Sequence, residues 1–300
     1  MASSSKLKLS VFTVATPDMT PEQLCEAAAA AGIDGIEWRC KETSPHLLSE
    51  PPSFWGNNLC TLSPSADDEE ISRFNQAASK HNRQAISVTP YLTCGDVEGT
   101  EQIMRLASKL GASMIRAGVP GYDRSRNYND LYTQALTYLQ EVEQLARTYN
   151  VKAIIETHHL TIAPSASLAH RLVSSFNHDH IGVLYDPGNM VYEGYENYRM
   201  GLELLGPYLA HVHVKNAGWQ PPAQQAQSVQ SANDPLQSIE WSCGWRPIAN
   251  GQVPWKQVLR DLKAVGYDGW LGLEDFSQTF DTPTMLQTYV NQIQTWMEEI

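Results

Sequence analysis

Strand-like and helix-like segments alternate from one end of the chain to the other, and this alternation limits the possible folds more than any other feature. Short, apolar, β-branched stretches recur eight times, with amphipathic helical patterns between them. The predicted strands are Leu7–Val14, Gly35–Arg39, Ala85–Tyr91, Ser113–Ala117, Val151–Thr157, Ile181–Tyr185, Leu209–Val214 and Trp270–Glu274. Because parallel neighbours need helical crossovers, the pattern predicts a (β/α)8 TIM barrel. A doubly wound sheet is the alternative, but no Gly-x-Gly-x-x-Gly follows any strand.

Helix signals agree with this alternation. The clearest predicted helices are Thr20–Ala31, Glu101–Leu110 and Leu131–Tyr149. Gly32, Gly111 and Gly266 each follow a helical pattern and suit the left-handed conformation of a C-terminal cap. We therefore expect residues 1–300 to form a single barrel domain.

Two long segments interrupt the rhythm, residues 44–64 and residues 217–253. Both follow predicted strands, so we expect them on the catalytic face of the barrel, where they can act as lids. The first segment suggests a small hairpin around Trp55–Leu62. In the second, Gln220–Gln230 reads equally well as a solvated insertion, whereas the stretch with Trp241 and Trp245 is too aromatic for that.

Composition narrows the class of protein. The 33 acidic residues exceed the 21 basic ones and give a formal charge of −12, which disfavours nucleic-acid binding. Five scattered cysteines without a Cys-x-x-Cys pattern are typical of reduced thiols. The start of the chain lacks a signal peptide's apolar core, and no apolar run reaches membrane-spanning length. We expect a cytoplasmic protein with no membrane partner.

Four of the predicted strands end in a residue that can bind a metal ion. Glu156, Asp186, His213 and Glu274 close four successive strands near the C-terminal half of the chain. A carboxylate that follows a strand is usually a helix cap or a solvated loop residue when it occurs alone. Four such residues in register predict convergence at one face, since all strand ends of a parallel barrel open there. Three carboxylates and one imidazole suit a divalent cation.

Strand parity separates the residues that face the barrel interior from those that face the helices. His211, His213 and Lys215 share one face of their strand, and Glu156 shares a face with His158. Glu274 likewise lies on the face of its strand opposite to Leu273. Charged side chains therefore enter the predicted interior only near its open end, where a polar site can be hydrated.

The chain resembles the sugar phosphate isomerase/epimerase family, which consists of xylose isomerase-like TIM barrels. The motifs that carry the resemblance span nearly the whole sequence in the family's order: GIEWR (35–39), IIETHH (154–159), GVLYDPGNM (182–190), HVHVK (211–215) and GYDGWLGLEDF (266–276). The resemblance implies that Glu156, Asp186, His213 and Glu274 bind one divalent ion, with Mn²⁺ the first candidate and Mg²⁺, Co²⁺ or Zn²⁺ the alternatives. His211 is expected to fill a deeper layer. A homodimer or homotetramer is also implied.

Departures from the family limit what the resemblance implies about the reaction. Ketose 3-epimerases of the family have a His where this chain has Asn189 and an Arg where it has Trp219. The endonuclease IV branch needs additional histidines and binds DNA, which the acidic charge opposes. Glu156 with His158, and His213 with Lys215, resemble motifs of the family's dehydratases. No glycine-rich phosphate cradle is apparent, so the substrate need not be phosphorylated.

We therefore expect a carbohydrate isomerase or epimerase that transfers a proton next to a carbonyl bound to the ion. Glu156 and Glu274 are the expected catalytic pair, one on each side of the ion. The first alternative is a dehydratase, or lyase, of a keto-cyclitol, a dehydroshikimate-like compound or a keto-sugar. The second alternative is a sugar-binding barrel without catalysis, although a binder needs no paired acid and base.

Further residues are candidates for contact with a small sugar or polyol. His158, Lys215 and Asn189 follow from their place beside the expected ligands. The other candidates lie at or near strand ends: Glu37, Trp38, Arg39, Tyr91 and Arg116. A structural ion pair is the alternative for Glu37 and Arg39. Packing is the alternative for Trp38 and Tyr91, whose rings can also stack on a sugar.

Overall fold

The computed structural model describes residues 7–221 and 240–300. Eight parallel strands form a closed barrel in the order β1-β11-β8-β7-β6-β5-β4-β2, and β2 pairs with β1 to close it. The barrel strands are β1 (Lys8–Phe12), β2 (Gly35–Cys40), β4 (Gln84–Pro90), β5 (Met114–Arg116), β6 (Lys152–Glu156), β7 (Ile181–Tyr185), β8 (Leu209–Val214) and β11 (Trp270–Leu273). All eight predicted strands are present, and the predicted barrel is confirmed.

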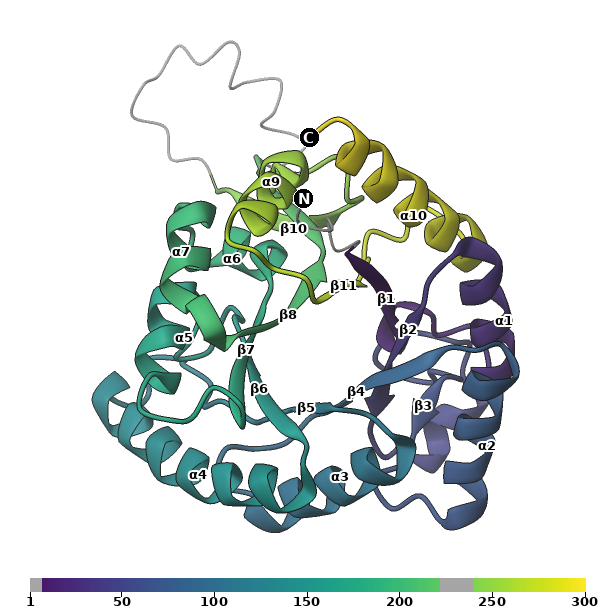
Figure 1. The fold of residues 1–300 in the computed structure, drawn as a ribbon, viewed down its shortest axis with the longest axis horizontal. Coiled ribbons are helices and arrows are strands. Elements are labelled where there is room, and N and C mark those ends of the chain that lie inside the picture. The colour runs from purple at the N-terminus through teal and green to yellow at the C-terminus, as the bar shows by residue number, and fades with distance from the viewer. Residues whose placement is uncertain (1–6, 222–239) are drawn as a thin grey trace, which may run out of the picture.

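Helices surround the strands as an outer ring (Figure 1). They are α1 (Pro21–Ala31), α2 (Asp68–Lys80), α3 (Val97–Leu110), α4 (Tyr128–Tyr149), α5 (Ala166–Val173), α6 (Pro187–Tyr192), α7 (Tyr198–Leu205), α9 (Trp255–Ala264) and α10 (Thr282–Glu298). Short 3-10 turns occur at η1 (Thr13–Ala15), η2 (Pro45–Ser49) and η3 (Gly206–Tyr208). Within the described ranges, no helix combines the length and the apolar character that a membrane crossing requires.

Local chemistry explains where the helices start and stop. At α1, the Thr20 hydroxyl accepts a hydrogen bond from the backbone N–H of Gln23, and the Gln23 side chain accepts one from the N–H of Thr20. The helix ends at Gly32, which has φ +87°. Gly111, with φ +70°, ends α3 in the same left-handed conformation. These residues confirm the helix ends expected from the sequence.

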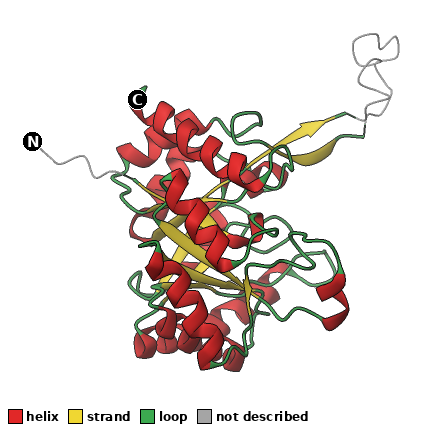
Figure 2. Cartoon of the chain, turned by 90° about the vertical axis from the view of Figure 1, so that its right-hand side faces the viewer, coloured by secondary structure: helices red, strands yellow, loops and turns green. Residues whose placement is uncertain are grey.

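The two interrupting segments differ in structure from what the sequence suggested. The hairpin expected around Trp55–Leu62 is wrong. Instead, β3 (Thr61–Leu62) runs parallel to β2 and extends its edge. In the second segment, β9 (Asn216–Gln220) and β10 (Ser242–Arg246) form an antiparallel ribbon that projects from the barrel (Figure 2). Most of the expected solvated insertion falls within residues 222–239, outside the described residues.

The ribbon also explains the aromatic character of the second segment. Its first strand, β9, begins directly after β8, so the ribbon rises from the carboxyl end of the barrel. Trp245 is partly buried and packs against Tyr192, with 4.7 Å between the ring centroids. Trp241, which directly precedes β10, is 52% exposed. The ribbon thus brings an aromatic side chain over the open end of the barrel.

Candidate active site

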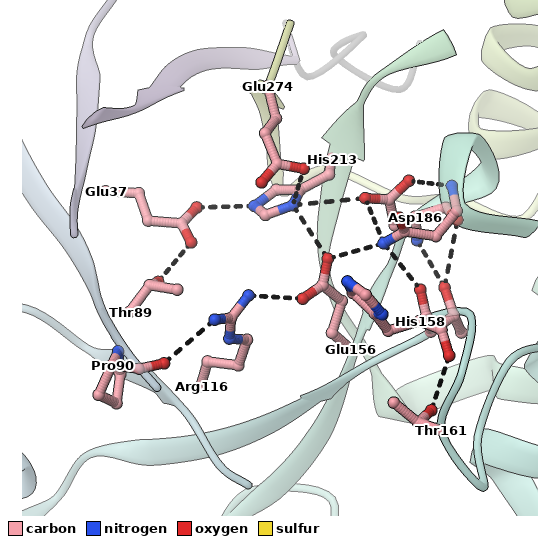
Figure 3. A network of polar contacts seen from close by, with 12 residues as sticks. Glu37, Thr89, Pro90, Arg116, Glu156, His158, Thr161, Asp186, His213 and Glu274 are labelled. Carbon is pink, nitrogen blue, oxygen red and sulfur yellow. Dashed lines mark hydrogen bonds and ion pairs between the residues drawn. The ribbon is translucent and has the colours of Figure 1, made fainter. Parts of the chain in front are cut away.

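Four ligand-type residues converge at the carboxyl ends of four neighbouring strands (Figure 3). Glu156 ends β6, Asp186 directly follows β7, His213 lies in β8, and Glu274 directly follows β11. Each offers one ligand atom, and these atoms all lie within 4.8 Å of one another. All four residues are buried. The closed barrel makes this convergence possible, because β6, β7, β8 and β11 are successive neighbours in the sheet.

The Nδ1 atom of His213 faces the three carboxylates. It lies 3.4 Å from Glu274 Oε2 and 3.7 Å from both Glu156 Oε1 and Asp186 Oδ2. It is buried and has no hydrogen-bond partner. A buried polar nitrogen without a partner is costly unless something else binds it. Together with the buried negative charge around it, this nitrogen suits a divalent cation, so the residues fit the metal expected from the sequence.

Glu37 holds His213 from the opposite side. His213 Nε2 and His211 Nε2 each lie 3.0 Å from Glu37 Oε2, and the hydroxyl of Thr89 donates to Glu37 Oε1. Burial alone would raise the pKa of Glu37, but the neighbouring charge of His213 and the hydrogen bonds from both histidines lower it. An ionised carboxylate only accepts hydrogen bonds, so Nε2 of His213 carries a proton, and Nδ1 is the ring nitrogen that would give its lone pair to a cation.

This arrangement corrects the role expected for Glu37. The side chain is 0% exposed and lies beneath His213, so it cannot touch a molecule in the barrel mouth. His211 is also fully buried and reaches the cluster through Glu37, as expected for a deeper layer. The alternative expectation, an ion pair between Glu37 and Arg39, is not formed between these two described residues.

Three cationic or amide side chains contact the carboxylates from above. Arg116 Nη1 lies 2.7 Å from Glu156 Oε2, and Lys215 Nζ lies 2.7 Å from Asp186 Oδ2. Lys215 also contacts Glu274 Oε2. The Asn189 amide donates to Glu156 Oε1 and Asp186 Oδ2, at 3.0 Å each. These contacts bind the ligand carboxylates to one another and fix their positions.

The same contacts keep the carboxylate of Glu156 ionised. Burial opposes ionisation, but the charges of Arg116 and Lys215 hold the pKa of Glu156 well below its usual value. Burial also opposes the charge on Lys215, yet the carboxylates of Asp186 and Glu274 raise its pKa. The centre is therefore a network of buried opposite charges and not a group of neutral acids.

A cavity of about 510 Å³ opens above the cluster. Among the residues expected to contact a substrate, Tyr91, Arg116, His158, Asn189 and Lys215 line it. Glu156 and Glu274 line it as well. The Tyr91 ring is 40% exposed, and the Arg116 guanidinium lies 5.1 Å from its centre. This volume is within the range of small-molecule sites.

Two other residues that were expected to contact a substrate, Trp38 and Arg39, do not line the cavity. Trp38 is 0% exposed and packs edge-on against Phe74 of α2, so strand parity turns its ring away from the barrel interior. Arg39 is 1% exposed, and its guanidinium donates to Thr61 of β3. It does not line the cavity, and its guanidinium carbon lies over the Tyr91 ring, 5.5 Å from the ring centre.

Several residues that line the cavity were not singled out from the sequence. They are Phe12, Trp55, His159, Trp245 and Phe276. His159 stacks on Tyr192 with 4.5 Å between ring centroids, and burial lowers its pKa to about 4. Its place directly after His158 was the available signal. For Trp55 and Trp245 the signal was the presence of tryptophan in two otherwise polar segments.

Comparisons with known proteins agree with the fold. A family model described as xylose isomerase-like TIM barrel matches residues 25–300. A search of curated proteins finds no match. A solved L-ribulose 3-epimerase is 15% identical, with a TM-score of 0.70, over 98% of this chain and 95% of its own. The probable 3-DHS dehydratase involved in petrobactin synthesis from Bacillus anthracis is 16% identical, with a TM-score of 0.69, over 96% and 99%.

A third solved structure was determined with a metal ion. It is a xylose isomerase-like TIM barrel protein from Mycobacterium smegmatis in complex with magnesium. It is 16% identical to this chain, with a TM-score of 0.66, and the match covers 98% of this chain and 99% of that one. At these identities the three structures support the architecture of the barrel.

Proposed function

The chain belongs to the xylose isomerase-like TIM barrel family, and on that premise we propose that it is a divalent-cation-dependent isomerase or epimerase of a sugar or keto-polyol. One observation carries the proposal. Two buried carboxylates, Glu156 and Glu274, belong to a four-ligand cluster and also line the cavity above it. A barrel that only binds sugar needs no such pair. Epimerase activity in a solved relative of the same fold supports this class of reaction.

Glu156, Asp186, His213 and Glu274 would hold the cation, through Nδ1 in the case of His213. A divalent ion bound there, with Mn²⁺ the first candidate, supplies positive charge that stabilises a substrate oxygen while a proton leaves the adjacent carbon. The protein fixes the position of this charge beforehand. Arg116, Asn189 and Lys215 lock the ligand carboxylates from outside, and Glu37 locks His213 from below.

Glu156 and Glu274 supply the proton transfer. Because Arg116 lowers the pKa of Glu156, this carboxylate is ionised and can accept a proton from the substrate carbon. Glu274 approaches from another strand, so the two carboxylates reach the substrate from different directions. Removal of a proton by one and return by the other inverts a carbon centre. Return of the proton to a neighbouring carbon gives aldose–ketose isomerisation.

Proton exchange into ketoses tests this function directly. The protein is loaded with Mn²⁺ and incubated in D₂O with a panel of ketoses and inososes, and deuterium uptake is followed by NMR. Glu156→Gln should reduce exchange by at least a hundredfold while the circular dichroism spectrum is unchanged, since the amide cannot accept the proton. Glu101→Gln is the matched control, because Glu101 lies on the outer helix α3. Exchange that persists undiminished in Glu156→Gln contradicts the role of Glu156.

A dehydratase is the second candidate, and one observation favours it. The ammonium group of Lys215 lies in the cavity wall beside Glu274, where it can donate a proton to a departing hydroxyl. The solved 3-DHS dehydratase shares the fold. Elimination would produce an unsaturated product with ultraviolet absorbance. Growth of this absorbance with an inosose or a dehydroshikimate-like compound favours the lyase, and exchange without absorbance favours the isomerase.

A further inference from the structure

A second cavity, of about 640 Å³, adjoins the cavity over the carboxylate cluster. We call them the outer cavity and the inner cavity. Both are lined by Trp55, Trp245 and Phe276, so these three rings form the boundary between them. The outer cavity is built from the segments that follow β1, β2 and β11, together with Trp245 of β10. Trp55 and Trp245 come from the two long segments that the sequence placed on the catalytic face.

Phe276 is the centre of this aromatic boundary. Its ring centroid lies 5.2 Å from that of Trp55, 5.6 Å from that of Trp245, and 5.1 Å from that of Phe54 in the outer cavity. Trp55 is nevertheless 54% exposed, and Phe280, which also lines the outer cavity, is 40% exposed. Exposed aromatic faces beside polar groups suit the C–H faces of a sugar ring.

Charge distinguishes the two cavities. The inner cavity is lined by the cationic side chains of Arg116 and Lys215. The outer cavity is lined by three carboxylates, of Asp18, Asp275 and Asp281, and none of its lining residues is Lys, Arg or His. A phosphate or carboxylate group would meet only like charge there. The outer cavity is therefore unsuited to an anionic group.

The three carboxylates retain acceptor capacity. Each uses its Oδ1 atom for one hydrogen bond to protein. Asp18 accepts from the Thr282 hydroxyl. Asp275 accepts from the backbone N–H of Ser277, and Asp281 from that of Thr284. Within the described residues, their Oδ2 atoms make no hydrogen bond to protein. Acceptors of this kind, next to exposed rings, match a group that offers several hydroxyl donors. A neutral polyhydroxylated ring has both properties.

We propose that the substrate carries a neutral glycosyl group, bound in the outer cavity while the reacting keto-sugar occupies the inner one. This inference rests on the proposed function and narrows its substrate class to keto-sugars attached to a second sugar ring. The aromatic boundary holds the linkage between the two rings. The glycosyl group adds binding energy at a distance from the reacting carbon, which orients the keto-sugar over Glu156 and Glu274.

The test compares ketohexoses with ketose disaccharides. Deuterium exchange is measured for fructose and for its neutral glucosides turanose and palatinose, with fructose 6-phosphate as the anionic comparison. At least one disaccharide should show a kcat/KM at least tenfold above that of fructose. Saturation-transfer NMR is run on the same samples and should detect contacts to protons of both rings, whether or not turnover occurs.

Variants connect the effect to the outer cavity. Phe54→Ala and Asp18→Lys alter residues that line the outer cavity and not the inner one. Each should lower the ratio of kcat/KM for disaccharide over fructose by at least fivefold. Tyr195→Ala is the matched aromatic control, because this ring is 64% exposed and lines neither cavity. It should leave the ratio unchanged.

The outcomes separate this inference from the proposed function. Exchange into fructose with no preference for any disaccharide overturns the glycosyl inference and leaves the isomerase proposal standing. Saturation transfer to both rings without exchange supports the outer cavity and contradicts the isomerase. Saturation transfer confined to one ring of every disaccharide overturns the inference regardless of turnover, as does a preference for fructose 6-phosphate.

Discussion

Replacing Glu37 with Gln should weaken metal binding although Glu37 cannot touch the metal. The carboxylate accepts hydrogen bonds from Nε2 of both His211 and His213, at 3.0 Å each, and all three side chains are 0% exposed. Ionised Glu37 fixes the proton of His213 on Nε2 and so leaves Nδ1 free for the cation. Both bonds end on the same atom, Oε2, so in Glu37→Gln an amide oxygen at that position can still accept them, with the amide N–H₂ facing the Thr89 hydroxyl. The neutral amide oxygen carries no charge and therefore holds the proton on Nε2 of His213 less strongly.

The size of the effect follows from the charge lost at the acceptor. A hydrogen bond to a charged group contributes about 1.5–3 kcal/mol, and one between neutral groups about 0.5–1.5 kcal/mol. Weakening the bond to His213 in this way therefore costs metal binding about 1–1.5 kcal/mol, which corresponds to roughly a 5- to 10-fold rise in the dissociation constant.

The assay measures affinity without any substrate. Protein stripped of metal with a chelator is titrated with Mn²⁺ in competition with a fluorescent indicator. Glu101→Gln, which makes the same change of charge on the outer helix α3, should bind as the wild type does. Thr89→Val removes the hydroxyl donor to Glu37 and should weaken binding by a smaller factor. If a folded Glu37→Gln protein binds Mn²⁺ within twofold of the wild type, the tautomer argument is refuted.

Further predictions concern stability and reactivity. Arg73 lowers the pKa of Glu22 to about 2. The ion pair between them therefore contributes its full stabilisation above the usual pKa of a glutamate and loses it as the pH falls toward 2. Because this pair is exposed, Glu22→Gln should lower the free energy of unfolding in urea by about 0.2–1 kcal/mol at pH 7 and by less at pH 3. An equal loss at both pH values contradicts the pKa shift of Glu22. Of the five cysteines, all of which lie among the described residues, only Cys243 is partly exposed. A thiol reagent should therefore label one cysteine in the folded protein. Rapid labelling of a second cysteine would contradict the burial of the other four. A Cβ on Gly188 would lie 2.9 Å from the backbone of Lys215. Gly188→Ala should therefore lower the free energy of unfolding by about 1–3 kcal/mol, measured by thermal unfolding. An unchanged stability would contradict a rigid contact at this position.

The sequence by itself determined the barrel and the convergence of the four candidate metal ligands. Eight strand patterns separated by helices have few compact arrangements, and the parallel barrel is the one that buries every strand. Once the strands are parallel, residues at their carboxyl ends must meet at one face. Glu156, Asp186, His213 and Glu274 could therefore be grouped although they are far apart in the chain.

Only the tertiary structure decided how deep each side chain lies. Strand parity gives the face of a residue but not its layer, which depends on the tilt and stagger of the strands around the barrel. Glu37 points inward, yet β2 pairs with β4 across a register shift between Ile36 and Glu37, and its carboxylate ends below His213. Trp38 turns outward against Phe74 instead. Parity alone gives the outward direction of Trp38, but it could not separate the depth of Glu37 from that of residues at the mouth.

The aromatic boundary between the two cavities also required the fold. Trp55, Trp245 and Phe276 belong to three segments without a common sequence pattern, and they meet because the segments leave neighbouring points of the closed barrel. Contacts between such connecting segments depend on their conformations, which local sequence signals do not define. The chemistry at the strand ends was therefore encoded locally, whereas the shape of the space above it arose only from long-range packing.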